Sequence, residues 1–335
     1  MENNPPQSIA VVTGANGFVG SHLVELLLQK GLAVRCIIRK GSNTKWLKDL
    51  NIELFDCGLL DPNLLKPIFE GASYVFHIAG VVNAPTKKEF FDGNVLTTKN
   101  VLEAALGNST IKKILITSSL AATGPSARSG EPLTENTLCQ PINAYGLSKL
   151  EQEKLVATYT DKLPLVVIRP PAVYGPRDTE IFLFFETVKK GILPLLGLFG
   201  HKTLSLVHVK DLVNGMFMAA SSDKTNGQIY FISSFKEYNW LTTGSLIAEA
   251  LGRKKPISIR VPHAIVYVVA SFGQIAAKLT KKKVDLDIER AKQVLAPSWY
   301  CSPEKANKDF GYTELIPIEE GLKETADWYK SQKWL

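Results

Sequence analysis

The sequence has little that would support a disulfide scaffold, a zinc site or a nucleic-acid-binding surface. Its four cysteines are far apart and form no CxxC pair, so neither a disulfide framework nor a thiolate metal site is expected. The net charge of +7 comes from basic residues that are scattered, apart from the three lysines at 281–283. This pattern indicates solvated faces and an anionic small ligand, so we expect no metal ion and no nucleic-acid partner.

The sequence also lacks a secretory leader and a long hydrophobic run. Its first residues, MENNPPQS, are polar and do not have the basic and then apolar pattern of a signal peptide. The most apolar stretch, 261–277, contains no Asp, Glu, Lys or Arg but has only 17 residues, the lower limit for a bilayer span. We expect a buried or lid helix there, and a membrane-contacting helix is the less favoured alternative. We also expect a cytoplasmic protein with reduced cysteines.

Strand and helix patterns alternate through the first half of the chain. The predicted strands are 9–13, 33–39, 52–57, 73–79, 113–118 and 165–169, and predicted helices include 21–30, 94–106 and 143–159. Short apolar runs between helices are typical of parallel strands buried on both faces. The predicted fold class is therefore α/β, a doubly wound parallel Rossmann sheet with a smaller mixed C-terminal substrate region.

The alternation breaks after Gly175. Residues 181–198 show no long regular period, and beyond them short strands alternate with helices, including 286–295 and 318–330. We predict that residues 1–175 form the dinucleotide-binding domain, with elements up to about residue 235 interleaved. Residues 176–335 would mainly form the substrate-binding region over the carboxyl edge of the sheet.

A glycine-rich turn follows the first predicted strand. Gly14, Gly17 and Gly20 stand between that strand and a helix. Glycines allow a tight turn and a close approach of a pyrophosphate to the backbone at the helix N-terminus. An incidental turn is the alternative, but a strand before the glycines and a helix after them favour dinucleotide binding.

Tyr145 and Lys149 are four residues apart in a predicted helix, so both project from one face. A phenol with a pKa of about 10 is a poor acid or base at neutral pH, but a nearby ammonium favours the phenolate. Tyr145 would exchange a proton with a substrate oxygen while hydride moves at the adjacent carbon. Ser119, after a strand, would hydrogen-bond that oxygen. The alternative is that both helical residues are ordinary surface residues.

Six motifs, in this order, resemble the extended branch of the short-chain dehydrogenase/reductases. They are TGANGFVG (13–20), HIAG (77–80), TSS (117–119), YGLSK (145–149), RPPAVYGP (169–176) and VHVKD (207–211). The resemblance covers nearly the whole chain and lies nearest the dihydroflavonol-reductase and 3β-hydroxysteroid-dehydrogenase side of the branch. It implies a Rossmann fold, the catalytic residues Ser119, Tyr145 and Lys149, and, by analogy, a homodimer.

The resemblance also implies cofactor contacts at the glycine turn, at strand ends and on the catalytic helix. These residues are Gly14, Gly17, Phe18, Val19, Gly20, Arg39, Lys40, Lys45, Asp56, Cys57, Ala79, Asn94, Thr117, Tyr145, Lys149, Pro170 and Val173. Cys57 is a departure, because the family usually has an aliphatic residue at that position.

Arg39 lies 19 residues after Gly20, and Lys40 and Lys45 follow it. NAD sites usually carry an acidic residue at this distance, and NADP sites an arginine. We therefore expect NADP(H) as the cofactor, with NAD(H) as the alternative; a solvated basic loop would explain the same residues.

Other candidate cofactor contacts have structural alternatives. Asn94 is either a cofactor or active-site contact or a helix N-cap. Pro170 and Val173 either flank the nicotinamide or mark a strand end interrupted by proline.

Three departures from the family pattern reduce the number of reactions that we expect of this chain. Ser119 is followed by Leu120 and Ala121, not by the acid pair of the dehydratases. Residues 204–206 read Leu-Ser-Leu, where nucleotide-sugar enzymes often carry a diphosphate-binding arginine. The apolar stretches 181–199 and 261–277 either fill the core or line a pocket for an apolar ligand.

We predict an NADP(H)-dependent oxidoreductase that interconverts a hydrophobic ketone or aldehyde and its alcohol. An NAD-dependent sugar epimerase that acts by transient oxidation is the first alternative. A non-catalytic dinucleotide sensor is the second.

Overall fold

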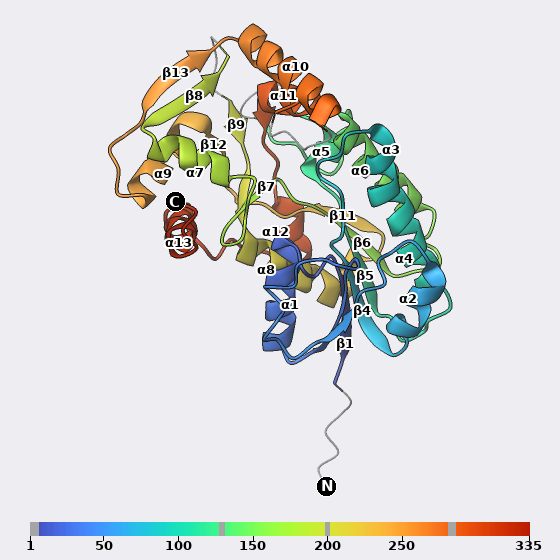
Figure 1. Cartoon of the computed structure of the whole chain (residues 1–335). Helices are drawn as coiled ribbons and strands as arrows, with labels where there is room; N and C mark the ends of the chain where they lie inside the picture. Colours follow the sequence, from blue (N-terminus) through green and yellow to red (C-terminus); the bar gives the residue numbers. More distant parts are fainter. Residues whose placement is uncertain (1–6, 127–130, 198–201, 281–285) are drawn as a thin grey trace.

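A seven-stranded parallel sheet forms the centre of the computed structural model, which describes residues 7–126, 131–197, 202–280 and 286–335 (Figure 1). The strand order is β11-β6-β5-β4-β1-β2-β3. The strands are β1 (Ile9–Thr13), β2 (Ala33–Ile37), β3 (Glu53–Phe55), β4 (Ala72–His77), β5 (Lys113–Thr117), β6 (Leu165–Arg169) and β11 (Gln228–Phe231). The predicted doubly wound sheet is confirmed.

Helices cover both faces of this sheet (Figure 1). On one face lie α1 (Phe18–Gln29), α8 (Val209–Ser221) and α12 (Glu304–Phe310), and on the other lie α2 (Pro62–Phe69), α4 (Thr97–Ala105) and α6 (Ala144–Ala157). A hydrophobic core lies on each face of the sheet, and successive strand residues point alternately into the two cores. Leu115 packs in the core on the first face, and Ile114 and Ile116 pack in the core on the second. Burial on both faces explains why these strands are continuously apolar.

The strand order reverses between β1 and β4. From β1 the chain goes to β2 and β3 on one side, and β4, β5 and β6 continue on the other. Ligands of open α/β sheets bind outside the carboxyl ends of the strands at such a switch point. Gly14 directly follows β1, and Ala79 follows β4 by two residues, so both lie at this crevice.

The helix predicted at 94–106 begins earlier than expected. Thr86 caps α3 (Lys87–Phe91) by accepting a hydrogen bond from the Glu89 backbone N–H. The π-helical turn η1 (Asp92–Leu96) joins α3 to α4 without a break. Asn94 therefore lies inside a continuous helical segment, and its interpretation as an N-cap is wrong.

The region after Gly175 contains more regular structure than the sequence indicated. Residues 181–198 include α7 (Phe182–Lys189) and β8 (Ile192–Leu196). Such short elements hold too few periods to be recognised from their pattern. The other small strands are β7 (Ala172–Tyr174), β9 (Thr203–Leu204), β10 (Leu206–His208), β12 (Tyr238–Asn239), β13 (Ile257–Val261) and β14 (Ser298–Trp299).

The aromatic side chains of α7 belong to the C-terminal core. The rings of Phe182 and Phe185 pack edge-on against Tyr329, and Phe184 stacks on Trp240. Trp240 and Tyr329 belong to α9 (Trp240–Ala250) and α13 (Ile318–Ser331). Of the two interpretations of this apolar stretch, the structure favours core filling.

Two further helices, α10 (His263–Thr280) and α11 (Ile288–Leu295), lie beyond the carboxyl ends of the sheet strands (Figure 1). Of the α10 side chains that the structure describes, only Val266 and Ala270 are buried. The expected buried helix is thus buried on one face only. Among the described residues, no helix combines the length and apolar character needed to cross a bilayer. The lysines at 281–283 lie outside those residues.

Candidate active site

The turn after β1 can be built only with glycine at two positions. Gly14 has a φ of +69°, and a Cβ there would come within 2.8 Å of the Ala79 Cα atom. A Cβ on Gly20 would come within 2.2 Å of the Gly14 carbonyl oxygen. Gly17 is the N-cap residue of α1, whose first N–H groups have no partner within the helix. This cradle fits the pyrophosphate of a dinucleotide, as predicted from the glycine spacing.

The candidate residues on the first turn of α1 pack against the protein. Phe18 and Val19 are half-buried against the first-face core. The Phe18 ring lies edge-on to His22, with 5.9 Å between the ring centres. Both residues help to fix the helix end at which a pyrophosphate would bind.

The segment after β2 is basic and exposed. Arg39, Lys40 and Lys45 all have exposed side chains, and the first acidic residue after β2 is Asp49. The Lys45 Nζ atom lies 4.0 Å from the centre of the Trp46 ring, a cation–π contact. Lys45 is therefore already engaged with the protein, and Arg39 and Lys40 are the more available cations.

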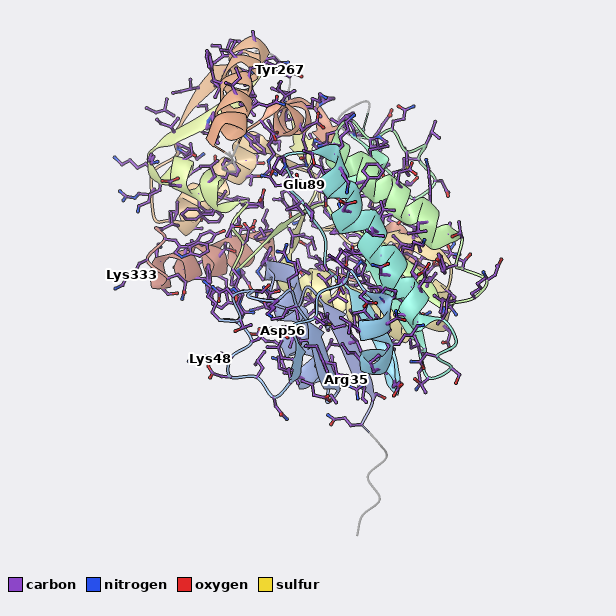
Figure 2. All side chains as sticks on the ribbon, turned by 45° about the vertical axis from the view of Figure 1, so that its right-hand side comes forward. Arg35, Lys48, Asp56, Glu89, Tyr267 and Lys333 are labelled. Atoms are coloured by element: carbon purple, nitrogen blue, oxygen red, sulfur yellow. The ribbon has the colours of Figure 1, made fainter. Side chains whose placement is uncertain are left out.

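The remaining cofactor candidates lie at the ends of other strands. Asp56, just after β3, is exposed on the same side of the molecule as Lys48 (Figure 2). Cys57 is half-buried, and burial raises the pKa of its thiol. Pro170 is buried, and its carbonyl oxygen accepts a hydrogen bond from the Leu120 N–H. Val173 is half-buried in β7.

Tyr145 lies in the first turn of α6, beside the Ser119 side chain, which interacts with its hydroxyl group. Asn143 caps this helix by accepting a hydrogen bond of 2.8 Å from the Gly146 N–H. Ser119 follows β5, and its Oγ accepts a hydrogen bond from the Ala121 N–H, 3.1 Å away. Burial raises the pKa of Tyr145, and the Ser119 hydrogen bond offsets part of that rise. At neutral pH the phenol is therefore protonated and can act as an acid.

Lys149 reaches from the next turn of α6 toward the end of β5. Its Nζ atom donates to the Thr117 carbonyl oxygen at 2.9 Å and to Gln152 Oε1 at 3.0 Å. Burial lowers the pKa of Lys149 to about 8, although Glu153 acts in the opposite direction. Gly80 leaves room for the ammonium, because a Cβ there would lie 3.1 Å from Nζ. The predicted group of Ser119, Tyr145 and Lys149 is thus assembled by β5 and α6.

Gln152 connects Lys149 to a buried chain of hydrogen bonds. Its Nε2 donates to Thr98 Oγ1 at 2.7 Å. The single Thr98 hydroxyl proton goes to the Asn94 carbonyl oxygen, 2.6 Å away. Thr98 Oγ1 must therefore accept from His77 Nε2, at 2.9 Å. Sequence reasoning missed Gln152, although its position three residues after Lys149 could have revealed it.

The chain of hydrogen bonds ends at the glycine turn. Because His77 donates from Nε2, its Nδ1 accepts from the Thr13 hydroxyl, 2.8 Å away. Burial lowers the pKa of His77 to about 3, so the ring is neutral. Thr13 Oγ1 in turn accepts from the Ala79 N–H at 3.3 Å. The position of Lys149 is thereby coupled to the end of β1.

Asn94 joins the segment after β4 to the catalytic helix. Its side chain accepts from the Val81 N–H at 2.7 Å and donates to the Val81 carbonyl oxygen at 3.0 Å. It also donates to Ser148 Oγ at 2.9 Å. The fully buried amide is therefore bound to protein groups on both sides and positions α6.

Two residues of α11 lie over the start of α6. Glu289 Oε2 accepts a hydrogen bond of 2.6 Å from the Ala144 N–H, next to Tyr145. Burial alone would raise the pKa of Glu289, but its hydrogen bonds with Lys292 and Ala144 outweigh burial and lower it. Arg290 forms an ion pair with Glu180. Sequence reasoning missed these contacts, because no local pattern relates residues so far apart.

The structure also shows the positions at which the sequence departs from the dehydratases and the nucleotide-sugar enzymes. Leu120 and Ala121, after Ser119, are buried, and no carboxylate stands at either position. Leu204 and Leu206 are buried as well, and Ser205 Oγ accepts from the Cys301 N–H at 3.0 Å. The Leu-Ser-Leu run thus builds the core and supplies no cation for a diphosphate.

The sheet topology, the glycine turn and the group of Ser119, Tyr145 and Lys149 together define an NAD(P)-dependent oxidoreductase of the Rossmann type. A model of the NAD dependent epimerase/dehydratase family matches residues 10–233. The chain belongs to this family, within the extended short-chain dehydrogenase/reductases.

Several curated relatives align over almost the whole chain. Ceramide reductase of Caulobacter vibrioides is 27% identical over 331 residues, which cover 98% of this chain and 96% of the relative. 2-alkyl-3-oxoalkanoate reductase of Shewanella oneidensis is 29% identical over 338 residues, 94% and 85% of the two chains. Sterol-4-alpha-carboxylate 3-dehydrogenase of Mus musculus is 27% identical over 331 residues, 94% and 89% of the two chains.

The fold is also that of a solved structure. UDP-glucose 4-epimerase of Thermotoga maritima superposes with a TM-score of 0.77 at 22% identity, over 97% of this chain and 99% of that chain.

Proposed function

We propose that this protein reduces an apolar ketone or aldehyde to its alcohol with NADPH and catalyses the reverse oxidation with NADP⁺. The observation that carries the proposal is the placement of Tyr145 beside Ser119, with Lys149 one helical turn away and held at the end of β5 by its bond to the Thr117 carbonyl oxygen. A binding module has no use for these three groups together at the crevice.

The chain's own residues supply the proton half of the reaction. Bound NADPH supplies a hydride to the carbonyl carbon. Ser119 and Tyr145 hydrogen-bond the carbonyl oxygen and orient the carbon, and the Tyr145 hydroxyl donates its proton to that oxygen. The Lys149 ammonium then stabilises the phenolate that remains. Since burial raises the pKa of Tyr145, the protein is in the form needed for reduction at neutral pH.

Preference for NADPH is supported by the basic segment after β2. Arg39 and Lys40 are exposed there, and no acidic residue precedes Asp49. A guanidinium binds a 2′-phosphate through paired, charge-assisted hydrogen bonds. An acidic residue, which would bind the free ribose hydroxyls of NAD, is missing.

Preference for an apolar substrate is supported by the surroundings of Tyr145 and by the relatives. The Phe90 ring lies 6.1 Å from the Tyr145 ring, and Val81 and Ala84 pack in the same small cluster. The names ceramide reductase, 2-alkyl-3-oxoalkanoate reductase and sterol-4-alpha-carboxylate 3-dehydrogenase denote substrates in which a carbonyl or hydroxyl group is joined to a large hydrocarbon skeleton. The buried Leu-Ser-Leu run argues against a nucleotide sugar.

A screen of cofactor oxidation tests the proposal. The protein is mixed with NADPH or NADH and with steroid ketones, long-chain 3-ketones, flavonoid ketones or UDP-4-keto sugars, and cofactor absorbance is followed. We expect NADPH oxidation with at least one apolar class and none with the sugars. Interconversion of UDP-glucose and UDP-galactose without net cofactor oxidation would replace the proposal by the epimerase alternative.

A further inference from the structure

Exposed apolar side chains concentrate on α10 and on the strand that precedes it. Among the described residues, 20 large hydrophobic side chains are exposed, and eight of them lie between residues 257 and 275. They are Ile257, Ile259, Ile265, Tyr267, Val268, Val269, Phe272 and Ile275. Large contiguous apolar patches are rare on soluble monomers and mark interaction sites.

The outward face of α10 is an apolar stripe. Val266 and Ala270 pack against Ala291 and Leu295 of α11. The opposite side carries exposed residues at helical spacing, namely Ile265, Val268, Val269, Phe272 and Ile275. Phe272 is 70% exposed, and Tyr267 lies at the rim of the molecule (Figure 2). This helix is therefore apolar on the side that faces away from the protein.

The β8–β13 ribbon extends this surface. In the parallel register Ile192 pairs with Ile257, Pro194 with Ile259, and Leu196 with Val261, so these six residues share one face. Near α10, Leu196 and Val261 pack beneath the helix. Farther along the same face, Ile192, Ile257 and Ile259 are exposed, Ile257 by 73%. We call the exposed residues of α10 and of this ribbon face the apolar surface.

The apolar surface lies in a long basic part of the sequence. Residues 253–284 contain eight Lys or Arg residues and no Asp or Glu, whereas the whole chain has a net charge of +7. The rest of the protein is therefore close to neutral. Arg253, Lys254 and Lys255 are exposed directly before β13. Apolar side chains bordered by cations are complementary to an anionic lipid bilayer, whose negatively charged surface attracts nearby Lys and Arg side chains.

We propose that the apolar surface docks reversibly on an anionic lipid bilayer, from which the protein takes its apolar substrate. The second half of this statement rests on the proposed function. The position of α10 supports it, because α11 lies directly beneath α10 and binds the Ala144 N–H through Glu289. One helix thus separates the docking face from Tyr145.

A second copy of the chain fits this surface less well. A two-fold dimer would pair the surface with itself. Such a dimer would bring the basic residues Arg253, Lys254 and Lys255 of both copies into one interface, to which residues 253–284 contribute no Asp or Glu. A bilayer that carries anionic headgroups satisfies both the apolar and the cationic residues.

Vesicle flotation with the full chain tests the proposal. Vesicles of phosphatidylcholine alone are compared with vesicles that also contain phosphatidylglycerol. We expect binding to the mixed vesicles and much weaker binding to phosphatidylcholine. V268E/F272E should weaken binding to the mixed vesicles at least tenfold, and K254Q/K255Q should remove most of the preference for the anionic lipid. L64E is the control, because Leu64 is also an exposed apolar residue but lies on α2, and it should bind like the wild type.

Three results would overturn the proposal: no flotation of the wild type with either vesicle, equal flotation of V268E/F272E, or equal losses in L64E and V268E/F272E. Light scattering tests the other possible occupant, a second copy of the chain. If the wild type is a dimer and V268E/F272E is a monomer, the apolar surface is an interface between copies. Flotation needs no turnover. V268E/F272E should oxidise NADPH with a water-soluble ketone at the wild-type rate. The activity assay therefore tests the proposed function, and flotation tests docking, so each can fail without the other.

Discussion

The surroundings of Lys149 and the outer face of α10 differ in which kind of side chain is buried and which is exposed. Around Lys149, polar side chains are buried and joined to one another from Gln152 to Thr13. On α10, apolar side chains are exposed to water. Buried polar groups and large exposed apolar patches are the two departures from the ordinary distribution of residues that carry information.

The proposed catalysis and the proposed membrane docking therefore depend on different parts of the fold. The proposed catalytic groups lie after β5 and on α6, where hydrogen bonds fix the orientation of Lys149 and burial changes the pKa values of Tyr145 and Lys149. The proposed recognition surface lies on two short strands and a helix that pack against the rest through α11. A substitution in the first region should therefore change chemistry, and one in the second should change access.

The largest expected effect is in the first region. Tyr145→Phe removes the proton donor and keeps the ring, so kcat should fall by about 10²–10⁴-fold while the Kd for NADPH is unchanged. Steady-state kinetics and cofactor fluorescence titration measure the two quantities. Tyr159→Phe, near the other end of α6, is the control and should retain full activity. If Tyr145→Phe kept more than a tenth of the wild-type rate, Tyr145 would not be the acid.

Arg39→Ala should have the next largest effect, on the cofactor alone. Loss of a charge-assisted hydrogen bond costs about 1.5–3 kcal/mol, so NADPH should bind about 10–150-fold more weakly, whereas NADH binding should stay the same. Lys48→Ala removes another exposed cation of the same segment and should change neither Kd. Equal losses for both cofactors in Arg39→Ala would show that Arg39 does not contact the 2′-phosphate.

Glu289→Gln examines the contact between the two regions. The hydrogen bond from the Ala144 N–H loses its charge assistance, so the start of α6 should be less well positioned. We expect kcat/KM for the ketone to fall about tenfold, the scale of a charge-assisted hydrogen bond, with the Kd for NADPH unchanged. Glu151→Gln, on α6 itself, is the control. An unchanged kcat/KM in Glu289→Gln would show that α11 covers the site without positioning it.

Substitutions of Gln152 should give the smallest effect, a shift in pH dependence. The pKa of Lys149 is about 8, so kcat/KM for reduction should fall as the pH rises through 8 and the ammonium loses its proton. A carboxylate at 152 favours the ammonium, so Gln152→Glu should move this fall to higher pH. Gln152→Leu removes an acceptor and should move it to lower pH. Shifts in the same direction would mean that both variants merely disturb packing.

The sequence predicted what depends on local pattern. The strand before Gly14 and the shared face of Tyr145 and Lys149 follow from spacing within one or two elements, and the structure has them as expected. The helix predicted from residue 21 begins earlier, at Phe18, so that Gly20 lies in its first turn. Ser119 followed from its position directly after an apolar strand. The assembly of Ser119 with Tyr145 also required the order of the motifs along the chain.

The contacts that the sequence could not show join distant segments. Gln152 meets Thr98 and Glu289 meets Ala144 only because the fold brings their elements together. Of the two interpretations of Asn94, the N-cap was wrong, because the π-helical turn continues the helix that Thr86 starts. The apolar stretch at 261–277 did not show which of its residues would be exposed. Hydrophobic periodicity shows which residues share one face of a helix, but not whether another part of the protein packs against that face.

The most direct measurement follows the hydride itself. The protein is incubated with an apolar ketone and NADPH deuterated at C4 of the nicotinamide, each C4 epimer being used in turn, and the alcohol is examined by mass spectrometry. Our account predicts one deuterium at the carbinol carbon with one epimer, and labelling that is about 10²–10⁴-fold slower with Tyr145→Phe. Absence of deuterium from every apolar alcohol, together with conversion of UDP-glucose to UDP-galactose without loss of NADPH, would contradict it.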